Sequence, residues 1–285
     1  MGVNPYRIEG PALISFSGGR TSAYMLWHIL DAHDGKLPDD VHVCFANTGK
    51  EREETLRFVH ECETRWSVRV NWLEFVTNRK RVPVEERFNV VGYNSASRGG
   101  EPFLRLIALK KAIPSTVSGR WCTEYLKVST MADFMGALGY REGAFSDVIG
   151  FRADEYDRVI ELPAKPRNAK RRLVFPLATV GIRKADILTW WASHPFDLGL
   201  ERGTGNCGQC PFLSRKARVA RVRLFPEDVP WWSDLERAHR GFTFGEDSFA
   251  DIERMARESP LLPLSDIEAD AAESECFGWC DRSAA

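Results

Sequence analysis

The sequence predicts an α/β protein with a doubly wound, mostly parallel sheet that carries helices on both faces. Short apolar runs alternate with helical patterns through about residue 190, an order typical of parallel strands joined by crossover helices. Residues 216–285 lose this strand pattern. We therefore expect one α/β domain over residues 1–215 and a small, mainly helical region over residues 216–285.

The first predicted strand and helix are joined by a glycine-rich turn. Apolar residues 12–16 precede this turn, and an amphipathic stretch at 23–30 follows it. The turn consists of Ser17, Gly18, Gly19, Arg20, Thr21 and Ser22. Its glycines allow the backbone to approach an anion closely, and N–H groups at a helix start hold phosphate oxygens. The Walker A spacing is absent, so these residues fit either another kind of phosphate loop or a plain strand-to-helix turn.

The second strand and helix repeat this order over residues 41–61. An apolar run ends in Asn47, Thr48 and Gly49, and an amphipathic stretch follows. Ligands of open α/β sheets bind at the carboxyl ends of adjacent strands. We therefore expect these three residues to line the same crevice as the first turn.

The next residues predict a weaker strand and a loop. Residues 68–75 alternate between apolar and polar side chains, as a strand nearer a sheet edge does. Residues 79–101 are polar and glycine-bearing. We expect a long loop there, either disordered or folded as a lid over a substrate.

Both glycine-ended turns resemble parts of one enzyme superfamily. The first is similar to the loop of the PP-loop ATP pyrophosphatases, usually Ser-Gly-Gly-Lys-Asp-Ser, with Arg20 for the lysine and Thr21 for the aspartate. Residues 47–59 resemble the second strand and helix of the phosphoadenosine phosphosulfate (PAPS) reductase family, a branch of those enzymes. The superfamily fold is adenine nucleotide alpha hydrolase-like, so the resemblance implies the same fold class as the strand and helix pattern.

Later stretches continue the resemblance in the same order. Residues 120–128 are similar to the family's Cys-Thr-x-x-Leu-Lys element. Residues 149–158 are similar to its Gly-x-Arg-x-x-Glu-Ser element, with Tyr156 where serine is common. Residues 174–177 and 183–191 resemble the strand and helix that close the family domain, so the likeness spans roughly residues 11–215.

The resemblance implies an adenine nucleotide site. ATP or PAPS would place its phosphates on the first turn, with Mg²⁺ bridging them, and Gly150 would also contact the nucleotide. Arg20, Arg152 and Glu155 are the candidate catalytic residues, because cations and fixed donors stabilise the charge that develops on phosphate.

The seven cysteines give a second group of candidates. Cys44 and Cys62 lie in apolar patterns and read as core fillers. Thiolates in a Cys-x-x-Cys loop suit zinc and iron–sulfur clusters equally by spacing, and the loop can also bind nothing. The resemblance favours a [4Fe–4S] cluster, with Zn²⁺ as the alternative. The candidate ligands are Cys122, Cys207, Cys210 and Cys280. Cys276 is the candidate catalytic or sulfur-carrying thiol, although either Cys276 or Cys280 could be the fourth ligand.

The implied reaction is ATP-driven adenylation of an acceptor followed by sulfur transfer. This reaction would need a sulfur donor, either sulfide or a cysteine desulfurase. The alternative is a sulfonucleotide reductase served by a thioredoxin-like reductant, and residues 275–278 only partly resemble the Glu-Cys-Gly motif of that group. A non-catalytic nucleotide or cluster sensor is a further alternative.

Composition fits a cytoplasmic globular protein. The 285 residues are 44% hydrophobic and 28% charged, with a net charge of −1. No apolar run is long enough to cross a bilayer, and the N-terminal residues lack the apolar core of a signal peptide. Residues 165–172 and 214–223 each carry five basic side chains, which fit either a nucleic-acid acceptor or solvated helix faces. The oligomeric state stays open, a homodimer included.

Overall fold

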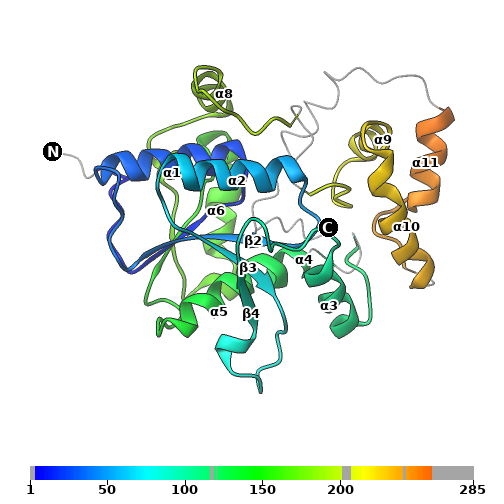
Figure 1. The fold of residues 1–285 in the computed structure, drawn as a ribbon, viewed down its shortest axis with the longest axis horizontal. Helices are drawn as coiled ribbons and strands as arrows, with labels where there is room; N and C mark the ends of the chain where they lie inside the picture. Colours follow the sequence, from blue (N-terminus) through cyan, green and yellow to red (C-terminus); the bar gives the residue numbers. More distant parts are fainter. Residues whose placement is uncertain (1–3, 116–118, 120, 201–206, 240–241, 259–285) are drawn as a thin grey trace.

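A computed structural model describes residues 4–115, 119, 121–200, 207–239 and 242–258. Its centre is a six-stranded sheet in the order β4-β3-β2-β1-β5-β6. The strands are β1 (Ala12–Ser15), β2 (Val41–Asn47), β3 (Val70–Phe75), β4 (Phe88–Val91), β5 (Ser146–Val148) and β6 (Arg172–Val174). All neighbours pair in parallel except β3 and β4. The predicted α/β fold with a mostly parallel sheet is therefore confirmed (Figure 1).

The order in which the strands are added to the sheet reverses beside β1. From β1 the chain winds through β2 and β3 to one edge, then returns to β5 and β6 on the other side of β1. Such a reversal leaves a crevice outside the carboxyl ends of the central strands, where ligands of open sheets bind. The segments that follow β1, β2 and β5 therefore surround this crevice.

Helices cover both faces of the sheet. They are α1 (Arg20–Ala32), α2 (Glu53–Arg65), α3 (Glu101–Lys110), α4 (Trp121–Thr123), α5 (Thr130–Ala137), α6 (Tyr156–Ala164), α7 (Pro176–Thr179) and α8 (Lys184–Ala192). A six-residue π-helix, Glu124–Ser129, links α4 to α5. In Figure 1, α1 and α2 lie on one face and α5 on the other.

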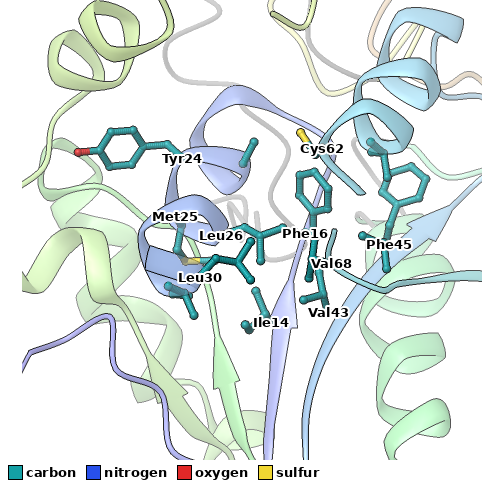
Figure 2. Close-up of a cluster of buried hydrophobic side chains, with 14 of the residues drawn as sticks. Ile14, Phe16, Tyr24, Met25, Leu26, Leu30, Val43, Phe45, Cys62 and Val68 are labelled. Atoms are coloured by element: carbon teal, nitrogen blue, oxygen red, sulfur yellow. The ribbon is translucent and has the colours of Figure 1, made fainter. Parts of the chain in front are cut away.

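Alternate strand residues supply the cores of the two faces. Ile14, Val43 and Phe45 pack with α1 and α2 residues in the larger cluster. Figure 2 shows this cluster, including Phe16 just beyond β1 and Met25 of α1. Leu13, Cys44 and Ala46 instead face α5. Because both faces are covered, the central strands are apolar on both sides.

The C-terminal helices share a core with the α/β unit. They are α9 (Arg215–Leu224), α10 (Val229–Ala238) and α11 (Phe249–Glu258). Val219, Trp232 and Phe249 pack in one buried cluster with Phe103 of α3 and Leu126 of the π-helix. The boundary expected at residue 215 thus falls at the start of α9.

The structure of residues 79–101 differs from the long loop that we expected. Instead of a structureless loop, they contain a 3₁₀ turn at Val84–Glu86 and the antiparallel strand β4. Phe88 is buried and its ring lies 5.8 Å from Phe134, which holds this short strand against β3. Residues 68–75 do lie near an edge, yet every residue of β3 is buried because β4 and helices cover it.

Two further findings concern cysteines and membrane spans. Cys44 and Cys62 are fully buried, which confirms them as core side chains, and burial raises the pKa of both thiols. Within the described part of the chain, no helix combines the length and the hydropathy needed to cross a membrane.

Candidate functional site

The glycine turn lies against α2 and is built by its own side chains. Gly18 has a φ of +77°, and a Cβ there would lie 2.7 Å from Thr55 Cγ2. Both facts require glycine. Ser22 Oγ accepts from Ser17 N–H at 3.2 Å and donates to the Gly19 carbonyl at 3.0 Å. The serine hydroxyls therefore shape the turn.

The start of α1 presents a helix end suited to an anion. Gly19 is its N-cap residue, no side-chain hydrogen bond caps the first turn, and this turn carries no acidic residue. Ser17, Gly19 and Arg20 are only half-buried. N–H groups at such an end, together with the helix dipole, favour negative charge.

Arg20 is held by the segment after α8. Its Nε and Nη2 donate to the Asp197 carboxylate at 2.6 and 2.5 Å, and Nη2 also donates to the Leu200 carbonyl at 3.1 Å. Partial burial would raise the pKa of Asp197, but the hydrogen bonds and charge of Arg20 outweigh burial and lower that pKa. A phosphate at the turn would have to compete with Asp197 for this guanidinium.

Arg152 joins the third predicted motif to the glycine turn. It follows β5, is 1% exposed, and donates from Nη1 to Thr21 Oγ1 at 3.3 Å. Nε donates to Asp154 Oδ1 at 3.0 Å. Gly150, two residues earlier, is also buried. The Gly-x-Arg element and the glycine turn thus meet at the carboxyl ends of the neighbouring parallel strands β5 and β1.

Glu155 acts as a local cap. Its Oε2 accepts from the Arg152 backbone N–H at 3.1 Å and lies 3.5 Å from Arg152 Nη1. Its Oε1 forms an ion pair with Arg158. These contacts fix the position of Arg152, so the structure places Glu155 beside Arg152 as a supporting carboxylate.

Asn47 is fully engaged inside the protein. Its Nδ2 donates to Glu74 Oε1 at 2.7 Å and to the Ser97 carbonyl at 2.9 Å, while its Oδ1 accepts from Gly49 N–H at 3.0 Å. Asn47 and Glu74 are register partners on β2 and β3. Sequence reasoning missed Glu74, because in an alternating strand pattern a carboxylate gives no signal of its partner on the neighbouring strand.

A buried ion pair connects the second turn to the π-helix. Lys127 Nζ lies 3.1 Å from Glu51 Oε1, which also accepts from Thr48 Oγ1 at 3.2 Å. The two side chains are 11% and 0% exposed. The other oxygen of Glu51, Oε2, is buried and has no hydrogen-bond partner among the described residues. Sequence reasoning missed Glu51, for which no local signal exists.

The Cys207–Cys210 loop contacts the same turn. Cys207 forms an antiparallel bridge with Glu51, and Gly208 N–H donates to the Lys50 carbonyl at 3.2 Å. Cys122 and Cys207 pack against the same apolar cluster, while Cys207 and Cys210 share another. The structure therefore brings the cysteine loop beside the second turn.

The described thiols supply only some of the ligands that a metal site needs. Cys207 and Cys210 offer two soft ligands from one loop, as zinc or an iron–sulfur cluster requires. Among the described residues, however, no three histidine, cysteine or acidic side chains are grouped so as to hold a metal ion. Cys276 and Cys280 lie outside the described residues. The cluster ligands therefore stay a prediction.

The basic run at 214–223 is turned inward only in part, because Arg215 and Lys216 are exposed. Arg218 and Arg221 are 4% and 2% exposed, and Arg215 pairs with Asp247 at 2.5 Å. In the run at 165–172, Arg171 pairs with the buried Asp147 at 2.8 Å. These contacts remove several charges from the surface that a nucleic acid would need.

A pocket of about 400 Å³ lies at the opposite, amino-terminal edge of the sheet. It is lined by residues around the start of β2 and before β3, His42 and Arg69 among them. The sequence-predicted site residues are not part of its lining. We therefore assign it no part in the candidate site.

Comparison with known proteins gives relatives without a stated activity. No protein-family model matches the chain. The chain is 32% identical over 209 residues to the uncharacterized nin region protein ORF290 of Escherichia phage lambda, covering 70% of this chain and 64% of that protein. It is 23% identical over 245 residues to an uncharacterized protein of Methanocaldococcus jannaschii, covering 82% and 43%. The chain thus spans less than two thirds of the length of these curated relatives.

Proposed function

We propose that the chain is a PP-loop enzyme of the PAPS reductase type, which adenylates an acceptor with ATP and then transfers sulfur to it. One observation carries the proposal. The glycine turn, the Asn47–Gly49 turn and Arg152 follow three adjacent parallel strands, and Arg152 contacts Thr21 of the glycine turn. Three sequence motifs that resemble one family are thereby grouped at one sheet edge.

In the proposed first step, an acceptor oxygen attacks the α-phosphorus of ATP. The bond from the α-phosphorus to the bridging oxygen breaks, and pyrophosphate leaves with that electron pair. The α1 N-terminus, Arg20 and Arg152 would stabilise the charge on the phosphate oxygens. Arg20 becomes available when phosphate displaces Asp197, whose bidentate contact occupies it.

In the second step, a sulfur nucleophile such as sulfide attacks the adenylated carbon. A carbon–sulfur bond forms, the carbon–oxygen bond breaks, and AMP leaves, so no oxidant or reductant is consumed. The Cys207–Cys210 loop, which bridges to the second turn through Glu51, would hold a cluster or zinc that binds the incoming sulfur. The burial of Arg218 and Arg221 argues against α9 as a nucleic-acid surface.

The test is an anaerobic assay of the full chain with ATP, sulfide and bulk tRNA or DNA. We expect pyrophosphate release, with thiolated nucleosides detected by mass spectrometry if nucleic acid is the acceptor. Sulfite release from PAPS without ATP-dependent thiolation would instead indicate a reductase. If neither product forms, both activities are contradicted and a sensor is favoured.

A matched pair of variants locates the site. Arg152→Met should abolish pyrophosphate release. Arg171→Met should not, because its buried ion pair with Asp147 lies before β6, at the amino-terminal edge of the sheet. Equal losses in the two variants would mean that Arg152 matters only for folding.

A further inference from the structure

The hairpin between β3 and β4 carries three consecutive cations. It begins where β3 ends and contains Arg79, Lys80 and Arg81, all of which are exposed. None of the three forms an ion pair with another described residue. The acidic residues of the same hairpin, Glu85 and Glu86, therefore leave these charges unneutralised.

The backbone that carries these cations is held in place. Arg87 donates from Nε to the Val82 carbonyl at 2.9 Å and from Nη2 to the Lys80 carbonyl at 3.2 Å. Its Nη1 lies 3.2 Å from the Asp133 carboxylate of α5. Val82 N–H also donates to the Arg79 carbonyl at 3.0 Å. The three cations thus extend from a defined turn that is attached to the sheet and to α5.

Helix α3 adds two more cations beside this hairpin. Arg105 Nη1 donates to the carbonyl of Phe75, the last residue of β3, at 3.4 Å. Arg105 and Lys111 are exposed and form no ion pair with a described residue, although Glu101 lies one turn before Arg105. At 1.5 Å per residue, Lys111 lies about 9 Å along the helix from Arg105. We call the five cations the β3–α3 basic surface: Arg79, Lys80, Arg81, Arg105 and Lys111.

This basic surface lies at the edge of the sheet that holds the candidate site. Because β3 is parallel to β2, the residues after β3 leave the sheet at the same edge as the Asn47–Gly49 turn. Neighbouring strands are about 4.8 Å apart, so β3 and β1 are roughly 10 Å apart across the sheet. A polymer bound on the surface can therefore reach the crevice beside the glycine turn.

The basic runs noted in the sequence differ from this surface. Arg171 and Arg215 have their charges engaged by Asp147 and Asp247. Exposed cations without acidic partners are what neutralise the phosphates of a bound nucleic acid and release its counterions. Of the described basic segments, the β3–α3 basic surface therefore suits such a ligand better than either run.

We propose that the β3–α3 basic surface binds the sugar–phosphate backbone of a nucleic acid and so brings an acceptor base to the crevice. A group of unpaired cations attracts a polymer that carries regularly spaced negative charges. The role of the nucleic acid as acceptor rests on the proposed function, whereas the binding itself does not. Backbone contacts of this kind position a nucleic acid without reading its sequence.

The experiment measures binding by fluorescence anisotropy, with fluorescein-labelled tRNA and labelled single-stranded DNA as the two probes. The full chain is titrated without ATP at several KCl concentrations. The first variant, Arg79→Gln/Lys80→Gln/Arg81→Gln, removes the three hairpin charges. The second, Arg105→Gln, removes the charge on α3. Circular dichroism checks that each variant is folded.

A matched control removes the same charge from the opposite edge of the sheet. Lys36, Arg69 and Lys170 are exposed and precede the parallel strands β2, β3 and β6. Lys36→Gln/Arg69→Gln/Lys170→Gln therefore has the same net charge as the hairpin variant. It should bind within about twofold of the wild type, because charges more than a Debye length from the ligand are screened.

We expect the hairpin variant to bind about tenfold more weakly than the wild type. Its plot of log K against log [KCl] should be shallower by about 2–3, because up to three phosphate contacts are lost. Equal losses in the hairpin variant and the control would overturn the surface, since net charge alone would then explain binding. If the hairpin variant does not fold, Arg105→Gln decides: a slope shallower by about 1 supports the surface, and an unchanged slope overturns it.

Two outcomes separate this inference from the proposed function. If the wild type binds neither tRNA nor DNA, the surface is overturned, while release of pyrophosphate from ATP with another acceptor would leave the proposed function standing. If the wild type binds nucleic acid and the hairpin variant does not, but no pyrophosphate is released, the surface is supported and the proposed activity is contradicted. Tighter binding of one probe than of the other identifies RNA or DNA as the ligand.

Discussion

At the scale of single residues, the Glu51–Lys127 pair has the clearest energetic consequence. Lys127→Met leaves a fully buried carboxylate without its cation. Removing one partner of a buried pair typically costs about 3–5 kcal/mol of unfolding free energy. Glu51→Gln combined with Lys127→Met removes both charges and should recover much of this loss. Urea denaturation of the two variants and the wild type measures it.

The double variant provides the decisive comparison for that pair. If Glu51→Gln/Lys127→Met is as unstable as Lys127→Met alone, the lost stability comes from the packing of the lysine stem. If Lys127→Met is as stable as the wild type, the carboxylate of Glu51 finds another partner or a proton at no cost.

Residues that act locally could be predicted from the sequence, and residues that act through register could not. The turn at Gly18 follows from its own neighbours, and the fold confirms a strand and a helix on either side of it. Glu74 meets Asn47 only because β2 and β3 pair in one register. Asp197 reaches Arg20 across 177 residues, and no spacing rule connects positions that far apart.

At the scale of elements, α1 and α8 meet through an aromatic cluster that contains a half-buried histidine. The His28 ring lies 5.1 Å from Tyr6 and 4.3 Å from Tyr24, and its Nε2 is buried without a partner among the described residues. Burial lowers the pKa of His28; Asp31 opposes this effect and His194 adds to it. The folded chain therefore holds His28 neutral at pH values where an unfolded histidine takes up a proton.

This gives a pH dependence with a definite sign. Below about pH 6.5, the unfolded state binds a proton at residue 28 before the folded state does, so stability falls as the pH falls. His28→Phe should lose less unfolding free energy between pH 8 and pH 5.5 than the wild type. Burial also lowers the pKa of His42. Because His42 is present in both proteins, its contribution to the pH dependence cancels in the comparison.

Denaturant titrations at the two pH values make this comparison. Parallel losses of stability in wild type and His28→Phe would show that His28 is protonated equally in the folded and unfolded states. The α1–α8 contact would then contribute nothing to the acid sensitivity of the protein.

The helix α9 shows where a sequence pattern misleads. Its five basic residues fit a solvated or nucleic-acid-binding face, yet residues 217–222 are all buried. The helix is enclosed by the cysteine loop on one side and α11 on another. Arg218, Arg221 and Arg223 donate to backbone carbonyls, a use that depends on neighbours from other parts of the chain.

At the scale of the whole molecule, the order of the strands decides where chemistry can occur. The reversal of strand order beside β1 places the segments after β1, β2 and β5 at one edge of the sheet. The cysteine loop reaches that edge through its bridge to Glu51. The alternation of apolar runs and helical patterns was enough to predict this sheet. The antiparallel β4 escaped prediction because its four residues form a strand only by pairing with β3.

The central claim is that phosphate binds at the glycine turn, and calorimetric titration of the full chain with ATP tests it most directly. Arg20→Ala should weaken binding by roughly 1–3 kcal/mol through loss of a charged donor. Asp197→Asn should tighten it by up to about 1 kcal/mol, because an exposed competing ion pair is removed. Arg254→Ala, which breaks only the pair with Asp251 on α11, should leave it unchanged. Absence of ATP binding to the wild type, or the same affinity in Arg20→Ala and the wild type, would contradict the account.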